Sequence, residues 1–129
     1  MAERTVRTRW DSGMRTVTQA GNFEVVVDEP ETAGGTDTGP QPTDLLLVSV
    51  SSCLALALAW VARKRGVDLL GLDVTAVGRY AGLKFDKISV TISSASPRSV
   101  VEDLLPEAQR VCYVSNTLRQ QPELTVEVT

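Results

Sequence analysis

The sequence predicts an α+β fold, in which strands and helices occupy separate stretches of the chain. Three observations support this class. The first 27 residues contain runs of alternating apolar and polar residues, residues 45–62 form an uncharged apolar stretch, and the C-terminal half contains two more alternating runs followed by helical patterns. These signals predict three strands, a helix, two strands, two helices and a last strand.

With 129 residues, of which 43% are apolar and 22% charged, the chain suits a single globular domain over residues 1–129. Its net charge of −3 argues against nucleic acid as a partner, because neutralising phosphates requires a basic face. The segment Met1–Trp10 is charged and lacks the apolar core of a signal peptide. We therefore expect a cytoplasmic protein whose thiols are kept reduced unless they act in redox chemistry.

The first third of the chain is predicted to be an antiparallel meander. Its strands are expected within the alternating runs at residues 4–10, 15–19 and 23–27. Gly13 and residues 20–22 supply the turns between them. Residues 28–42 (DEPETAGGTDTGPQP) then predict an irregular connection, of a length that is often functional or mobile.

The uncharged stretch is predicted to lie in a helix that begins at Pro42 and ends before Gly66. This start places Asp44 at the third helical position, where a carboxylate favours the helix dipole. The stretch also fits a membrane span, because the basic residues 63–65 follow it like a positive-inside flank. It contains three serines and lies at the lower edge of the length that a span requires. We therefore favour a buried helix in a soluble protein and expect no membrane partner.

A helix of about 24 residues would be about 36 Å long, which is more than a chain of this size covers easily. Because the helix is apolar on nearly all sides, one of its faces would stay exposed in a monomer. A second copy of the chain is the natural cover for that face, so the sequence predicts a homodimer.

The C-terminal half is predicted to contain a hairpin, two helices and a strand. Residues 70–80 and 85–94 alternate as two strands, and residues 96–97 open a helix. Pro106 lacks the N–H that a helix interior needs, so we expect a kink or a short break there. The remaining elements are a helix over residues 112–121 and a strand that carries Leu124, Val126 and Val128.

The chain contains no histidine and only two cysteines. These counts exclude Ser-His-Asp and Cys-His catalysis, histidine-ligated zinc and a four-thiolate metal site, and we expect neither a metal nor a cofactor. Any nucleophilic or redox chemistry must therefore rest on Cys53, Cys112, carboxylates, lysine, tyrosine or serine, with arginine as the electrostatic helper.

Cys53 lies in the middle of the predicted long helix. The helix dipole cannot lower its pKa there, since that effect fades within the first turn. A reactive Cys53 therefore needs a nearby cation, and arginine is the candidate in the absence of histidine. Arg15 is the first choice, followed by Arg4, Arg7 and Arg9. An inert, packed cysteine is the alternative.

Cys112 lies at the predicted start of a helix, where free backbone N–H groups can stabilise a thiolate. Two cysteines on separate helices suggest a peroxidatic and resolving pair, with packed, inert cysteines again as the alternative. Their spacing in the sequence does not show whether the two thiols meet.

Four segments of the chain occur together in a known family: residues 39–47 (GPQPTDLLL), 51–53 (SSC), 71–74 (GLDV) and 112–118 (CYVSNTL). This combination resembles the OsmC/Ohr family of osmotically inducible and organic hydroperoxide resistance proteins, and the resemblance runs from Thr8 to Val128. It implies an OsmC-like α+β fold in an intertwined homodimer, in which two long central helices pack together and both chains contribute strands to the sheets.

The resemblance also implies a thiol-dependent peroxidase that reduces organic hydroperoxides and, less well, hydrogen peroxide. The cysteine matching Cys53 attacks the peroxide, and the one matching Cys112 resolves the sulfenic acid as a disulfide. A dithiol reductant, which carries lipoyl groups for several family members, then restores the thiols. The alternatives are a non-catalytic dimer that binds a hydrophobic ligand beside Cys53 or senses oxidation, and a structural protein with two inert cysteines.

The chain departs from the family pattern around its reactive cysteine. In well-characterised family peroxidases, a glutamate about ten residues before that cysteine pairs with a catalytic arginine. Here Thr43 occupies the glutamate position and Asp44 follows it, a shift of about 100° around a helix. Arg15 matches the arginine, so the resemblance implies that Arg15 activates the thiolate and that Asp44 or Thr43 orients it.

Two further points qualify the match. Asp44 could instead serve only to complement the helix N-terminus. Tyr113 stands where a proline commonly follows the second cysteine. These departures resemble a less characterised branch of the family.

Overall fold

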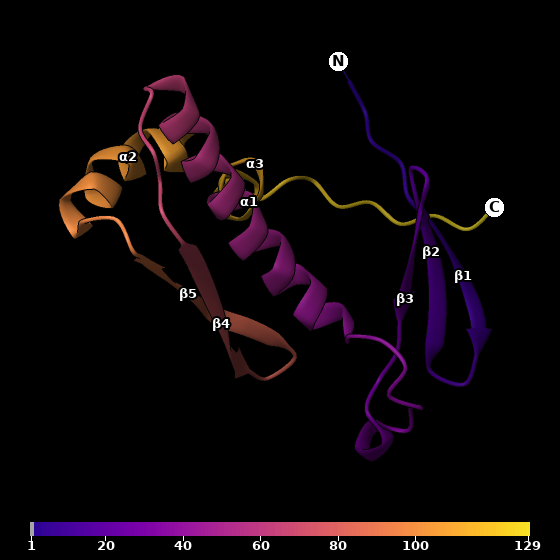
Figure 1. Ribbon diagram of the computed structural model, residues 1–129. Helices are drawn as coiled ribbons and strands as arrows, with labels where there is room; N and C mark the ends of the chain where they lie inside the picture. The colour runs from indigo at the N-terminus through magenta and orange to yellow at the C-terminus, as the bar shows by residue number, and fades with distance from the viewer. Residues whose placement is uncertain (1) are drawn as a thin grey trace. The chain divides into compact units, whose positions relative to one another are not determined.

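The computed structural model describes residues 2–129 and confirms the α+β class, with antiparallel sheets and helices in separate stretches of the chain (Figure 1). The chain divides into two compact units, at residues 1–46 and 47–129. Helix α1 (Pro42–Lys64) begins in the first unit and continues in the second. A single domain over residues 1–129 stays a prediction.

The N-terminal unit contains the predicted meander. Its strands are β1 (Arg7–Ser12), β2 (Arg15–Ala20) and β3 (Phe23–Val27). They form an antiparallel sheet in the order β1-β2-β3. Gly13 and Gly21 adopt left-handed backbone conformations in the two tight turns, with φ of 53° and 59°, which glycine tolerates without steric cost. The first of these turns places Arg15 at the start of β2.

The connection after β3 is irregular, as predicted, and it closes on itself. It contains one short 3₁₀ helix, η1 (Glu31–Ala33), within the described residues. The backbone N–H of Asp28 donates to the carbonyl of Pro40 at 3.1 Å, so the two ends of the connection meet. A Cβ added at Gly39 would lie 2.5 Å from the carbonyl oxygen of Val26, and therefore only glycine allows the chain to return this closely.

Helix α1 begins at the predicted residue and ends close to the predicted stop. The Asp44 carboxylate accepts a hydrogen bond from the Gln41 N–H at 3.3 Å and so caps the start, while Gly66, with φ of 67°, follows the end. The buried face of α1 consists of Val50, Leu54, Ala57, Leu58, Val61 and Ala62. Among residues 2–129, α1 alone is long and apolar enough to cross a membrane, a test that core helices of soluble proteins also pass.

The C-terminal unit packs a hairpin and a second helix against α1 (Figure 1). Its further elements are β4 (Leu72–Ala81), β5 (Lys84–Ser94), α2 (Arg98–Val111) and α3 (Tyr113–Arg119). Strands β4 and β5 pair antiparallel, which confirms the predicted hairpin. The core combines apolar side chains of α1, α2 and the hairpin, among them Leu58, Leu104, Ala108, Val74 and Ile92.

The expected interruption at Pro106 is not a helix end. Helix α2 continues through Pro106, because the burial of Leu104 before it and Ala108 after it offsets the lost backbone hydrogen bond. The helical stretch is interrupted instead at Cys112, whose backbone is extended, with φ of −80° and ψ of 101°. This break separates α2 from α3 and gives Cys112 a backbone geometry of its own.

The predicted last strand is not a strand in this structure. The alternation at Leu124, Val126 and Val128 is present, but all three side chains are exposed. A strand requires a hydrogen-bonded neighbour, and no strand of the described chain pairs with residues 120–129. An alternating pattern is therefore insufficient without an edge to receive it.

Candidate functional site: a pair of thiols beside an apolar cavity

The structure brings the two cysteines together. Cys53 lies half-buried on α1, and Cys112 is fully buried at the junction between α2 and α3. Their side chains are neighbours in the core, and both are free thiols. Spacing in the sequence could not establish this contact, because it depends on how α2 packs against α1 in the core.

Short-range hydrogen bonds hold the backbone around Cys112. The side-chain amide of Asn116 donates to the carbonyl of Arg110, and the backbone N–H of Asn116 donates to the carbonyl of Cys112, both at 3.0 Å. The Ser115 hydroxyl donates to the same Cys112 carbonyl at 3.3 Å. Cys112 is therefore fixed as the residue before α3, next to the free N–H groups of the first helical turn.

The two thiols bind their protons differently. Burial raises the pKa of Cys112, but the neighbouring side chain and N–H of Ser115 and the neighbouring Cys53 thiol outweigh it, so this pKa lies below its ordinary value. Burial raises the pKa of Cys53, and its interaction with Cys112 adds to the rise, while the N–H of Val114 opposes it. Negative charge is therefore favoured on Cys112, and Cys53 still requires a cation to become a thiolate.

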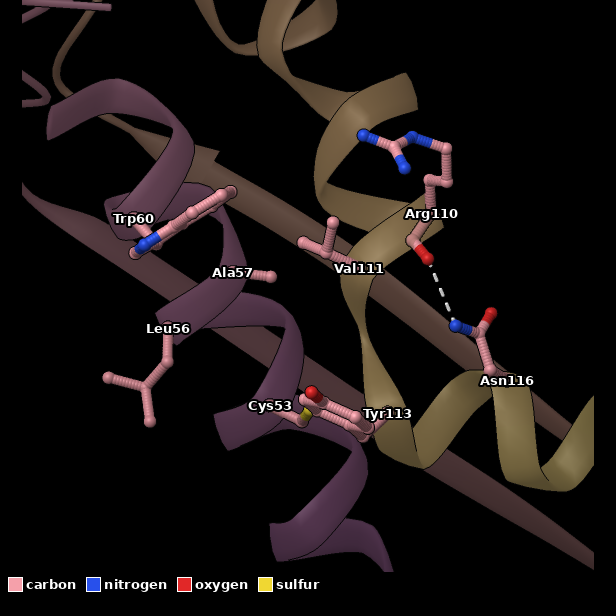
Figure 2. Close-up of a pocket in the computed structure, with 8 residues that line it drawn as sticks. All are labelled: Cys53, Leu56, Ala57, Trp60, Arg110, Val111, Tyr113 and Asn116. Carbon is pink, nitrogen blue, oxygen red and sulfur yellow. Dashed lines mark hydrogen bonds between the residues drawn. The ribbon is translucent and has the colours of Figure 1, made fainter. Parts of the chain in front are cut away.

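A cavity of about 750 Å³ lies beside Cys53 (Figure 2). Figure 2 shows its lining in two groups, one on α1 and the other around the break between α2 and α3: Cys53, Leu56, Ala57 and Trp60, and Arg110, Val111, Tyr113 and Asn116. Most of these side chains are apolar, and Arg110 supplies a cation. Residues 2–129 contain no group of three or more side chains arranged to hold a metal ion.

Arg15 is half-buried at the start of β2 and has two polar partners in the N-terminal unit. Its Nη1 donates to Asp11 Oδ2 at 2.6 Å, and its Nε donates to the hydroxyl of Thr38 at 3.1 Å. The contact with Arg15 holds the pKa of Asp11 below its ordinary value. Arg15 and Cys53 belong to different units, so the activation of Cys53 by Arg15 stays a prediction.

Thr43 and Asp44 lie in the first turn of α1. The Asp44 carboxylate caps the helix through the Gln41 N–H, which is the alternative role that its position suggested. In the described chain, the partners that orient Arg15 are Asp11 and Thr38. That Asp44 or Thr43 orients the arginine stays a prediction.

Sequence reasoning missed Asp11 and Thr38 as partners of Arg15. Asp11 lies across the tight turn from Arg15, and the shift in pairing register between β1 and β2 at that turn is not visible in the sequence. Arg15 contacts Thr38 only because the connection between β3 and α1 folds back on itself. The repeated threonines in the segment 34–39 (GGTDTG) were the available signal.

The chain belongs to a known family. A family model described as OsmC-like protein matches residues 35–127, so the chain is a member of the OsmC-like family, as its resemblance to OsmC/Ohr proteins predicted. No curated protein matches the sequence.

Solved structures confirm the OsmC-like fold. A protein from Psychrobacter arcticus, assigned to the osmotic stress and detoxification response, has a TM-score of 0.77 at 20% identity, covering 91% of this chain and 89% of that chain. An OsmC-like protein from Mycoplasma pneumoniae has a TM-score of 0.74 at 16% identity, covering 99% and 96%. A Vibrio cholerae protein assigned to organic hydroperoxide resistance, with captopril bound in one of its active sites, has a TM-score of 0.67 at 25% identity, covering 94% and 88%.

Proposed function

We propose that this protein is a thiol-dependent peroxidase that reduces organic hydroperoxides and, less well, hydrogen peroxide. The observation that carries the proposal is the proximity of Cys53 and Cys112, two free thiols, one on α1 and one at the break between α2 and α3, beside an apolar cavity. Membership of the OsmC-like family and the hydroperoxide resistance role assigned to the Vibrio cholerae relative support the same reaction.

The reaction begins when the Cys53 thiolate attacks one oxygen of the hydroperoxide. A sulfur–oxygen bond forms, the oxygen–oxygen bond breaks, and the alkoxide takes up a proton and leaves as an alcohol, so that Cys53 becomes a sulfenic acid. The Cys112 thiolate then attacks the Cys53 sulfur, a disulfide forms and hydroxide leaves as water. The lowered pKa of Cys112 suits this resolving role, because the attacking sulfur is readily deprotonated.

A cation completes the proposed site. Burial and the neighbouring Cys112 both raise the pKa of Cys53, so a guanidinium close to its sulfur is needed to form the thiolate at neutral pH. We assign this role to Arg15, on the resemblance to the family, with Asp44 or Thr43 facing the same arginine. A dithiol reductant, of which a lipoyl protein is one candidate, returns the disulfide to two thiols in the cytoplasm.

The proposed working form is a homodimer. Leu56 is 70% exposed and Trp60 is 52% exposed on the face of α1 that carries the cavity, although both are large apolar residues. The exposed alternation of the C-terminal tail also fits addition to a strand edge of a second chain. Contact between two copies would remove both apolar surfaces from water.

Rapid mixing of the reduced protein with cumene hydroperoxide tests the reaction. The expected course is loss of one thiol per chain, followed by an intrachain disulfide, and multiple turnovers when dihydrolipoamide is added. A Cys53→Ser variant that consumed the peroxide as fast as the wild-type protein would overturn the proposal. Ser52→Ala, a change at the exposed neighbouring residue, is the matched control and should leave the rate unchanged.

A second candidate function is non-catalytic binding or redox sensing, which the apolar cavity beside Cys53 favours. It predicts tight binding of an apolar ligand, detectable through the fluorescence of Trp60 in the cavity wall. It also predicts a single oxidation of Cys53 without turnover when a dithiol reductant is present. Steady-state peroxide consumption therefore separates the two functions.

A further inference from the structure

We propose that Thr38, held in place by the buried carboxylate of Asp28, is a positioning residue for the guanidinium of Arg15. This inference rests on the proposed function, in which Arg15 activates the Cys53 thiolate. It assigns the orientation of the arginine to the connection between β3 and α1, and thus to residues within the N-terminal unit.

The carboxylate of Asp28 holds Thr36 and Thr38 in place. Asp28 is fully buried, and its carboxylate accepts five hydrogen bonds. Oδ1 accepts from the N–H groups of Glu29 at 2.8 Å and Thr36 at 3.3 Å. Oδ2 accepts from the Thr36 hydroxyl at 2.5 Å and from the Thr38 N–H and hydroxyl at 3.1 and 2.7 Å. The Thr36 and Thr38 hydroxyls hold the pKa of Asp28 far below its ordinary value, against the effect of burial, so the group stays ionised.

The bond to Asp28 fixes the polarity of the Thr38 hydroxyl. A hydroxyl has one proton to donate, and Thr38 gives this proton to Asp28 Oδ2. The lone pairs of the same oxygen are then available to the Nε–H of Arg15, which lies 3.1 Å away. The Thr38 oxygen can therefore only accept a hydrogen bond from the arginine. Its bond to the Asp28 carboxylate polarises the hydroxyl and makes the oxygen a stronger acceptor.

Two anchors then define the plane of the guanidinium. Thr38 holds Nε, and Asp11 holds Nη1 at 2.6 Å. Within the described residues, Nη2 of Arg15 has no hydrogen-bond partner, so its N–H groups remain available to a thiolate or to a peroxide oxygen. An arginine anchored at two atoms loses less rotational freedom when it binds an anion than a free side chain does.

The connection itself leaves Thr38 little freedom. The backbone N–H of Asp37 donates to the carbonyl of Glu29 at 3.0 Å, and Asp37 adopts a left-handed conformation with φ of 55°. A Cβ on Gly35 would lie 1.9 Å from the same Glu29 carbonyl oxygen, so the chain approaches itself as closely as glycine permits. The backbone around Thr38 is therefore fixed, and the bond to Asp28 fixes its hydroxyl.

Three variants of the full chain test the proposal: Thr38→Val, which removes the hydroxyl, Thr38→Ser, which retains it, and Thr18→Val as the matched control. Thr18 lies on β2, the strand that begins at Arg15, but its hydroxyl bonds to Thr8. The first measurement is the ¹⁵N NMR signal of the Arg15 Nε–H group, assigned by its loss in Arg15→Lys. We expect Thr38→Val to shift this signal and to speed its exchange with water, and Thr38→Ser and Thr18→Val to leave it close to the wild-type signal.

The second measurement is the rate of Cys53 oxidation by cumene hydroperoxide as a function of pH. We expect Thr38→Val to lower the second-order rate constant about tenfold, as for loss of a hydrogen bond to a charged group, and to raise the pH at which the rate reaches half its maximum. Thr38→Ser should restore both values. An unchanged Nε–H signal in Thr38→Val would overturn the proposal, as would an unchanged rate and pH profile in a variant whose signal had shifted.

The two readouts distinguish failure of this proposal from failure of the proposed peroxidase function. If the wild-type protein does not consume peroxide, or if Arg15→Lys oxidises as fast as wild type, the role of Arg15 in activation falls, while the NMR signal still reports whether Thr38 holds the guanidinium. Circular dichroism of each variant verifies folding. If Thr38→Val fails to fold, Thr38→Ala removes the same hydroxyl without adding bulk, and the same two readouts decide.

Discussion

The thiols of Cys53 and Cys112 are neighbours in the core, and each changes the pKa of the other. Their interaction favours the thiolate of Cys112, towards which the Cys53 thiol can donate its proton, and disfavours the thiolate of Cys53, so the two titrations are linked. We expect Cys53→Ala to raise the pKa of Cys112, because its thiolate loses a donor, and Cys112→Ala to lower the pKa of Cys53 while burial still holds it up. Thiolate absorbance measured against pH in each single-cysteine variant reports both shifts. Equal pKa values in variant and wild type would mean that the thiols do not interact.

The same contact predicts the fate of oxidised Cys53. After treatment with one equivalent of cumene hydroperoxide, the wild-type protein should contain an intrachain disulfide, seen in a peptide map as the loss of two hydrogens from the linked Cys53 and Cys112 peptides. Without a partner thiol, Cys112→Ser should accumulate the sulfenic acid and then the sulfinic acid at Cys53. A disulfide that joins two chains would contradict the geometry.

Two leucines on opposite faces of α1 separate folding from association. Leu58 is fully buried, so Leu58→Ala should lower the free energy of unfolding by about 3 kcal/mol, measured by urea denaturation. Leu56 is 70% exposed in the single chain, so Leu56→Glu should leave the fold intact but shift sedimentation equilibrium towards monomers. A wild-type protein that sediments as a monomer at all concentrations would remove the case for the homodimer.

Asp44 offers a test of its two candidate roles. Its carboxylate accepts the Gln41 N–H at the start of α1, so Asp44→Ala should destabilise the protein by about 1 kcal/mol through loss of the cap, with the rate of Cys53 oxidation unchanged. Asp44→Asn keeps an acceptor oxygen and should recover most of the stability. A fall in the oxidation rate larger than the loss of stability explains would instead place Asp44 against the activating arginine.

Local signals predicted most of the fold, because they act within a few residues. The turns at Gly13 and Gly21, the start of α1 at Pro42 and the β4–β5 hairpin all depend on propensity and period. Features that depend on contacts between residues far apart in the sequence could not be predicted as well. The proline in α2 was tolerated because Leu104 and Ala108 are buried, and the tail pattern lacked a strand to join.

The candidate site was predictable as a set of residue types but not as an arrangement. Without histidine, the two cysteines were the evident nucleophiles, and the family resemblance assigned their order of action. Their contact, and the contacts of Arg15 with Asp11 and Thr38, form only when segments far apart in the sequence fold back on one another. An acidic residue in a polar, glycine-rich segment gave no sign that it would be buried, as Asp28 is.

The buried carboxylate of Asp28 predicts how the protein responds to acid. Its pKa is depressed in the folded state, so it contributes stability that is present above the pKa of an unfolded aspartate, about 3.9, and is lost as the pH falls further towards the folded value. Wild-type stability, measured by urea denaturation from neutral pH downwards, should therefore decline steeply below about pH 4. Asp28→Asn cannot supply this charge, so it should be less stable at neutral pH and lose less stability on acidification.

Asp37→Asn, at an exposed position of the same connection, is the matched control for Asp28→Asn and should follow the wild-type curve. The Arg15 signal connects this experiment to the site, because the Asp28 carboxylate is the acceptor that commits the Thr38 hydroxyl towards the arginine. The depressed pKa keeps Asp28 ionised in the folded chain over the range where stability falls, so the Arg15 Nε–H signal of the wild-type protein should stay unchanged there, whereas in Asp28→Asn it should already be displaced at neutral pH. Parallel acid curves for Asp28→Asn and wild type would show that folding does not lower the pKa of Asp28, and the hydrogen bond assigned from the Thr38 hydroxyl to its carboxylate would fall with it.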